Sequence, residues 1–181
     1  MSASTCEYKA QPIERSFETV LSFAQELINV NGTFVPRPIN TAPLTPVIGR
    51  LLLRFSRDLS VVKFRLSVFG NANPLSINQL VTVATLNAGR SSENGPIIAV
   101  LFNNPTGIRV NGLLASGILT NANIRHVTSA SGNTYNTVAS LLQGIRKGDV
   151  YVNILGSNRD PNTPGFANGL IRGQIFARQT D

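Results

Sequence analysis

Apolar and polar side chains alternate along much of this chain, and the alternation predicts β-strands. The clearest case is a pair of segments, Val47 to Arg57 and Ser60 to Gly70, joined by a short polar turn. In the second segment the apolar positions are Val62, Phe64, Leu66 and Val68, with Lys63, Arg65 and Ser67 between them. A period of two residues is typical of a strand with one buried face, so we expect an antiparallel hairpin. A slip of one residue would bury Lys63 and Arg65, and the register is therefore strongly specified.

Further strands are predicted before and after this hairpin. They cover residues 17–23, 79–86, 96–103, 113–119, 148–154 and 169–176. Ile97 to Phe102 is continuously apolar, which is expected of a strand covered on both faces. Val150, Val152 and Ile154 alternate with polar residues, as in a strand with one buried face.

One helix and one long loop interrupt the strands. Apolar residues recur at i, i+3, i+4 and i+7 between Thr137 and Lys147, and Gly148 follows as a C-cap, so the spacing predicts a helix there. The stretch from Asn29 to Pro46 contains four prolines and predicts a long irregular loop. Within it, Asn31-Gly32-Thr33 matches an N-glycosylation acceptor, and a glycine-containing loop explains the same residues equally well.

Together these elements predict an all-β fold: an antiparallel β-sandwich or flattened barrel of about eight strands with one short helix. The chain has 181 residues with 15 glycines, 10 prolines and no tryptophan, which suits one domain of strands and turns. We place that domain at residues 16–181. Residues 1–15 are polar and without periodicity, and we expect them to form an N-terminal arm.

The net charge of +7 comes from 16 basic residues against nine acidic ones, and arginine dominates. If the hairpin register is right, Arg50, Arg54, Lys63 and Arg65 share one solvent-facing sheet surface that could contact an acidic ligand. We find no specific nucleic-acid-binding motif. The longest apolar run is too short to span a membrane, and the first twenty residues do not resemble a signal peptide.

Four segments, in order, resemble the chordin-type (CHRD) domain family. They are Phe23 to Val30, Asn94 to Phe102, Leu113 to Ile124, and the final pair Gly148 to Asn153 with Gly169 to Phe176. The resemblance implies a domain usually found outside cells. That family usually carries histidines at three positions that correspond to Thr85, Asn87 and Leu155 here. Any metal or proton chemistry of those histidines is therefore not carried over, and we predict no catalytic residue, metal or cofactor.

The other candidate residues point to structure or association. His126 is the only histidine and has no Asp or Glu within twenty residues, so we expect a surface or loop residue. Arg172, on the final strand, is predicted to pair with a carboxylate such as Asp149, or with backbone carbonyls, and to lock two strands together. Cys6 is the only cysteine and lies in the arm; it is either a disulfide partner for another chain or an inert thiol.

These observations favour a protein that works without enzymatic chemistry, by association. Our main hypothesis is a structural subunit of an extracellular fibre, a spore surface or a virion coat, which forms a homo-oligomer or polymer. In it the arm would add a strand to a neighbour's sheet edge or form a disulfide through Cys6. The alternative is a binding module that holds an acidic glycan or another polyanion on its arginine-rich face.

Overall fold

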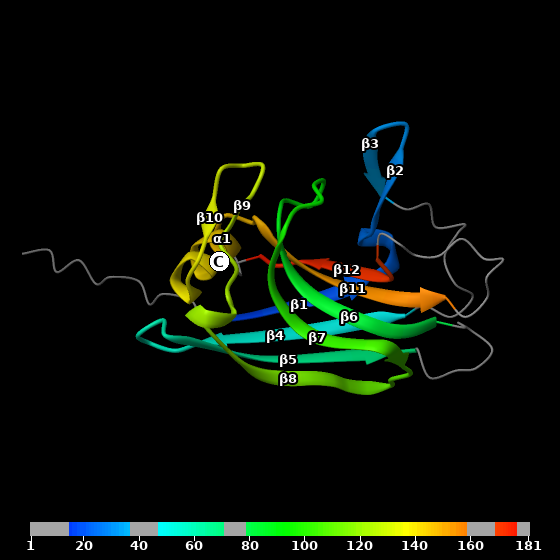
Figure 1. Cartoon of the computed structure of the whole chain (residues 1–181), viewed down its shortest axis with the longest axis horizontal. Coiled ribbons are helices and arrows are strands. Elements are labelled where there is room, and N and C mark those ends of the chain that lie inside the picture. The colour runs from blue at the N-terminus through cyan, green and yellow to red at the C-terminus, as the bar shows by residue number, and fades with distance from the viewer. Residues whose placement is uncertain (1–14, 37–46, 71–78, 159–168, 177–181) are drawn as a thin grey trace, which may run out of the picture.

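Strands and short helices follow one another along the whole described chain in the computed structural model, which describes residues 15–36, 47–70, 79–158 and 169–176 (Figure 1). The elements are β1 (Ser16–Ser22), η1 (Phe23–Gln25), β2 (Leu27–Val30), β3 (Thr33–Pro36), β4 (Ile48–Phe55), β5 (Val61–Phe69), β6 (Gln79–Ala88), β7 (Ile97–Ile108), β8 (Gly112–Thr120), η3 (Asn121–Asn123), β9 (Val127–Thr128), β10 (Thr134–Tyr135), α1 (Val138–Arg146), β11 (Val150–Asn158) and β12 (Ile171–Gln174).

Eight of these strands form a single antiparallel sheet in the order β7-β6-β11-β12-β1-β4-β5-β8. The sheet curls until it is nearly closed, which makes the fold a flattened barrel. The predicted all-β class, with about eight main strands and one short helix, is therefore confirmed. Two small hairpins, β2–β3 and β9–β10, stand outside the main sheet.

The interior of the barrel is apolar and is closed at one end by α1. Inward-facing side chains alternate along the strands, and β5 shows this most clearly, with Val62, Phe64, Leu66 and Val68 buried. The apolar face of α1 joins the same core through Val138, Leu141, Leu142 and Ile145. Figure 1 shows α1 together with the β9–β10 hairpin at one end of the strands.

The hairpin of β4 and β5 has the predicted register. Arg54 lies opposite Lys63 and Leu53 opposite Phe64, so the charged side chains point outward and the apolar ones into the core. The helix also forms where it was predicted. Its N-cap, Thr137, accepts a hydrogen bond from the Ser140 backbone N–H at 3.1 Å.

The predicted loop from Asn29 to Pro46 is wrong in its first part. Residues 27–36 form the β2–β3 hairpin, in which Asn31 and Gly32 have φ angles of 53° and 85°. Two consecutive left-handed residues make the tight turn that matches the twist of a hairpin, and Asn-Gly is the preferred pair for it. Residues 37–46 lie outside the described residues.

Two predictions of strand burial also need correction. β7 is an edge strand, and Val100 in its middle is 38% exposed, so its apolar run is not covered on both faces. β11, predicted to have one buried face, is instead central, and Tyr151 and Asn153 on its polar side are buried as well. The cover over these polar residues comes from distant parts of the chain and is described below.

Candidate functional site

The sheet has two outer surfaces of opposite character. We call the outward side of β1, β4, β5 and β8 the open face, because its side chains point to solvent. We call the outward side of β6, β11 and β12 the covered face, because η1, β2 and the loop of residues 89–96 lie over it. In Figure 1 the β2–β3 hairpin stands above β11 and β12, on this covered side.

The open face carries the four basic residues that the register had placed together. Arg50, Arg54, Lys63 and Arg65 are all exposed. Arg54 lies directly opposite Lys63, a pairing of like charges across neighbouring strands. Arg50 forms an ion pair with Glu18 on β1, and this hydrogen bond raises the pKa of the guanidinium. Glu18 is the only acidic side chain on the open face of the described strands.

Large apolar side chains share the open face with these charges. They are between 41% and 55% exposed. Ile48 and Phe69 face each other across β4 and β5, and Ile118 lies opposite Lys63 on β8. The full set is Val20, Ile48, Phe69, Leu113 and Ile118. A concentration of exposed apolar side chains on one surface is typical of a contact site.

The covered face is built of polar side chains in two rows across three strands. Tyr151 lies between Asn87 and Gln174 in the first row. Asn153 lies between Thr85 and Arg172 in the second. All six residues are at most 9% exposed. This polar layer was not predicted, because each residue alone looks like an ordinary solvent-facing position of a strand.

Arg172 is the centre of this layer. Its guanidinium lies 3.4 Å from the ring centroid of Tyr151. Nη1 donates to Asn94 Oδ1, and Nη2 donates to the carbonyls of Arg90 and Glu93, each at 2.8 Å. Burial lowers the pKa of Arg172, and the neighbouring phenol and carboxylates partly oppose this shift. Arg172 thus fastens the loop over the strands, largely through backbone carbonyls.

Asp149, which we suggested as the partner of Arg172, has other partners. Its carboxylate accepts hydrogen bonds from Ser129, Ser131, Asn133 and Tyr135 at 2.6–2.8 Å. Burial would raise the pKa of Asp149, but these bonds outweigh it, and the pKa lies below its ordinary value. The carboxylate therefore ties the β9–β10 hairpin to the start of β11, at the end of the barrel.

Glu26 is the carboxylate that faces the Arg172 cluster. It is 1% exposed and acts electrostatically on both Arg172 and Tyr151. Gly169 makes room for it, since a β-carbon at that position would collide with the carboxylate. The φ angle of 131° at Gly169 also disfavours any other residue. The sequence does not reveal this contact, which joins residues 143 positions apart.

Gln174 and Tyr151 complete the attachment of the covering segments. The Gln174 amide donates to the carbonyls of Gly89, Gly148 and Val150, each at 3.0 Å. The Tyr151 hydroxyl accepts from the Gly95 backbone N–H at 3.1 Å. Burial raises the pKa of this phenol. Gln174 and Tyr151 therefore both bind the loop of residues 89–96, which covers the strands.

Two of the positions at which the chordin-like family carries histidines belong to this layer. Thr85 Oγ1 donates to Asn87 Oδ1 at 2.6 Å, and Asn87 Nδ2 donates to the Gly95 carbonyl at 3.1 Å. Leu155, the third position, lies opposite Val83 on β6. Asn87 thus binds the covering loop, as Arg172 does, and Thr85 orients the Asn87 amide.

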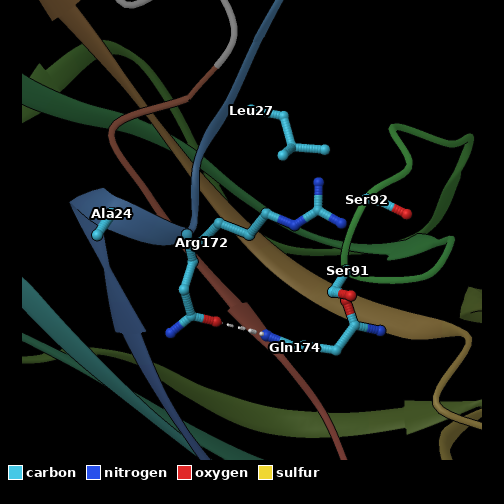
Figure 2. A pocket seen from close by; sticks show the side chains of 7 residues that line it. Ala24, Leu27, Ser91, Ser92, Arg172 and Gln174 are labelled. Atoms are coloured by element: carbon cyan, nitrogen blue, oxygen red, sulfur yellow. Dashed lines mark hydrogen bonds between the residues drawn. The ribbon is translucent and has the colours of Figure 1, made fainter. Parts of the chain in front are cut away.

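A half-open cavity of about 300 Å³ remains between the covering segments (Figure 2). Figure 2 shows the Arg172 guanidinium lying between Leu27 and Ser92, with Gln174 beside Ser91. The cavity is lined by Ala24, Gln25, Leu27, Ser91, Ser92, Arg172 and Gln174. The N–H groups of Arg172 and Gln174 already donate to the loop of residues 89–96 and to the neighbouring strands. These two side chains therefore line the cavity and also hold the loop over the strands.

The remaining candidates give no further site. His126 is exposed in the loop before β9, as expected. Cys6 and residues 1–14 of the predicted arm lie outside the described residues. Among the residues that the structure describes, no group of three or more His, Cys, Asp or Glu side chains could hold a metal ion. Nor does any helix in the described ranges have the length and apolar content needed to cross a bilayer.

Comparison with known proteins does not assign this chain to a family. No protein-family model, curated protein or solved structure matches this chain. The chordin-like resemblance stays a prediction that rests on the segments named above.

Proposed function

We propose that this protein is a structural subunit that works by association, without enzymatic chemistry, in an extracellular fibre, a spore surface or a virion coat. The observation that carries this proposal is the presence of five half-exposed apolar side chains on the open face, interspersed with basic residues. The strands beneath them are well packed, so the barrel does not need these side chains for its own core. A contact with a neighbouring molecule would remove them from water, which is favourable for apolar surface.

The charge of the open face bears on the geometry of assembly. Two open faces placed against each other would bring two sets of the basic side chains Arg54, Lys63 and Arg65 into one interface. Like charges in contact are unfavourable, so the open face is better suited to a different surface of its neighbour. Contacts between two different surfaces are heterologous and generate rings or filaments. The apolar and basic residues of one face are therefore compatible with a polymer.

Sedimentation velocity and electron microscopy of the purified chain test this proposal. We expect species larger than a dimer for the wild type, and we expect Phe69→Lys to prevent them. Phe176→Lys is the matched control, because Phe176 is 59% exposed but lies after β12 and outside the open face. A wild type that stays monomeric at high concentration would contradict the proposal, as would equal effects of the two substitutions.

A second candidate function, binding of an acidic glycan or other polyanion, is favoured by the like-charged pair Arg54–Lys63. A groove of about 290 Å³ adjoins it, lined by Arg15, Ser16, Phe17, Glu18, Leu52, Leu53 and Arg54. An anion bound there would relieve the repulsion between the two cations.

Binding of heparin or polyphosphate at several salt concentrations tests this second function. We expect affinity to fall steeply as the salt concentration rises. Arg54→Ala and Lys63→Ala should each reduce the slope of log affinity against log salt concentration by about one. Arg109→Ala removes an exposed charge outside the open face and should change the affinity much less. Absence of binding at low salt would exclude the function.

A further inference from the structure

The main sheet ends at β8, which hydrogen-bonds to β5 on one side and is separated from β7 on the other by the gap in the nearly closed barrel. Among the described strands β8 pairs with β5 and with no other. Its nine residues, Gly112 to Thr120, include no charged residue and no proline. Natural edge strands usually carry such residues because a bare edge readily pairs with another strand.

The opposite edge, β7, is different. It contains Pro105, and its ladder with β6 is interrupted by three register shifts. Proline and irregular pairing both blunt an edge against further strand addition. The sheet thus has one edge strand with a proline and irregular pairing, β7, and one with neither a proline nor a charge, β8.

We propose that β8 pairs antiparallel with β8 of a second copy, about a two-fold axis at Ile118. This inference rests on the proposed function and names its first contact. The ladder between β8 and β5 is irregular near Leu113 but regular from Ser116 to Thr120. A two-fold axis at Ile118 uses only the regular part and places Ser116 opposite Thr120 of the other copy.

The pairing also covers exposed apolar surface. Ile118 is 55% exposed on the outward side of β8, and at the two-fold axis it would meet Ile118 of the second copy. Directly opposed side chains in an antiparallel pair lie close enough for apolar contact. The strand is uncharged, so this self-pairing opposes no like charges along β8 itself.

Charge favours this edge contact over stacking of two open faces. The nearest basic side chain is Lys63, which lies opposite Ile118 on β5. In the proposed dimer the two Lys63 residues are three strand spacings apart, or about 14 Å. Salt screens charges beyond about 8 Å at physiological ionic strength, so their repulsion is weak. Stacked open faces would place both sets of charges in one interface.

Sedimentation equilibrium of Ile118→Lys and Val20→Lys is the first test. Val20 is the matched control, since it is 54% exposed on the same face but lies on an inner strand. We expect Ile118→Lys to weaken the dimer about tenfold or more, because two lysines would oppose each other at the axis. Val20→Lys should leave the dimer intact.

The outcomes separate this inference from the proposed function. Assembly of Ile118→Lys at wild-type affinity would overturn the β8 contact and leave the structural role standing. Equal weakening by both substitutions would assign the contact to the open face and also overturn the inference. A wild type that remains monomeric would overturn both.

A disulfide trap is the second test and does not depend on affinity. Ile118→Cys is made in a Cys6→Ser background, with Val20→Cys in the same background as control. Opposed residues in an antiparallel pair have Cα atoms about 4.5–5.5 Å apart, which suits a disulfide. Mild oxidation should give a covalent dimer for Ile118→Cys alone. No dimer, or equal dimer from both variants, would refute the proposed register.

Discussion

The covered face and the open face lie on one sheet and differ in what satisfies their polar groups. On the covered face Arg172 is 1% exposed and donates to three acceptors in the loop of residues 89–96. On the open face Arg54 and Lys63 are exposed and lie opposite each other. The first arrangement stabilises the fold, whereas the second is of no benefit to the isolated chain. If the protein works by association, as we propose, the open face is the surface that would meet a partner.

Among the substitutions considered, Arg172→Ala should lower the free energy of unfolding most. The change leaves the Asn94 side chain and two loop carbonyls without their donor and the Glu26 carboxylate without its buried cation. Loss of one partner from such a buried cluster costs about 3–5 kcal/mol. Urea unfolding followed by circular dichroism measures it.

Arg54→Ala is the matched control on the open face. An exposed arginine with no buried partner should change stability by no more than about 0.5 kcal/mol. Equal losses for the two variants would show that the faces do not differ as described.

Asp149→Asn removes a buried charge that lies away from both faces. It should give the next largest loss in the free energy of unfolding. Hydrogen bonds hold the folded-state pKa of Asp149 below its ordinary value. The unfolded chain therefore takes up the proton first, near pH 3.9, and this part of the stability is lost as pH falls from about 5 through the folded pKa.

Thermal unfolding at a series of pH values measures the effect. We expect Asp149→Asn to cost about 1–3 kcal/mol at neutral pH, because the substituted amide cannot accept all the donors around it. The gap between the wild type and the variant should narrow as pH falls below about 4. A gap that is the same at every pH would contradict the assignment of a charged Asp149.

Lys63→Glu should change the free energy of unfolding least, and it should increase it. Opposite Arg54, a glutamate replaces a like-charge pair by an attractive one and should stabilise the fold by about 0.2–1 kcal/mol. The gain should shrink at high salt. The same variant should bind polyanions less tightly. A destabilised variant would mean that the charges of the open face already stabilise the barrel.

The β4–β5 hairpin and α1 could be predicted because their signals are local. On β5 every second residue is apolar and buried, and the residues between them lie on the outer side of the sheet. The period and register predicted from the sequence therefore match those of the structure. The helix has its own N-cap at Thr137 and a single apolar stripe. Neither element needs information from distant residues.

The covered face could not be predicted because its cover is remote in sequence. Tyr151, Asn153 and Arg172 have the spacing of exposed positions, and only the segments near Glu26 and Asn94 bury them. The two halves of this contact lie about 80 to 150 positions apart in the sequence and are adjacent only in the folded structure. A local signal did exist for the β2–β3 hairpin, since Asn31-Gly32 is a turn pair, but the prolines that follow it suggested a loop instead.

The burial of two tyrosines gives the chain its own optical reporter. The sequence has three tyrosines and no tryptophan. Burial raises the pKa of both Tyr135 and Tyr151, so neither phenol should ionise where an ordinary tyrosine does. Tyr135 reports on the attachment of the β9–β10 hairpin, and Tyr151 on closure of the loop over Arg172. An alkaline absorbance titration therefore reads out whether both attachments are still in place.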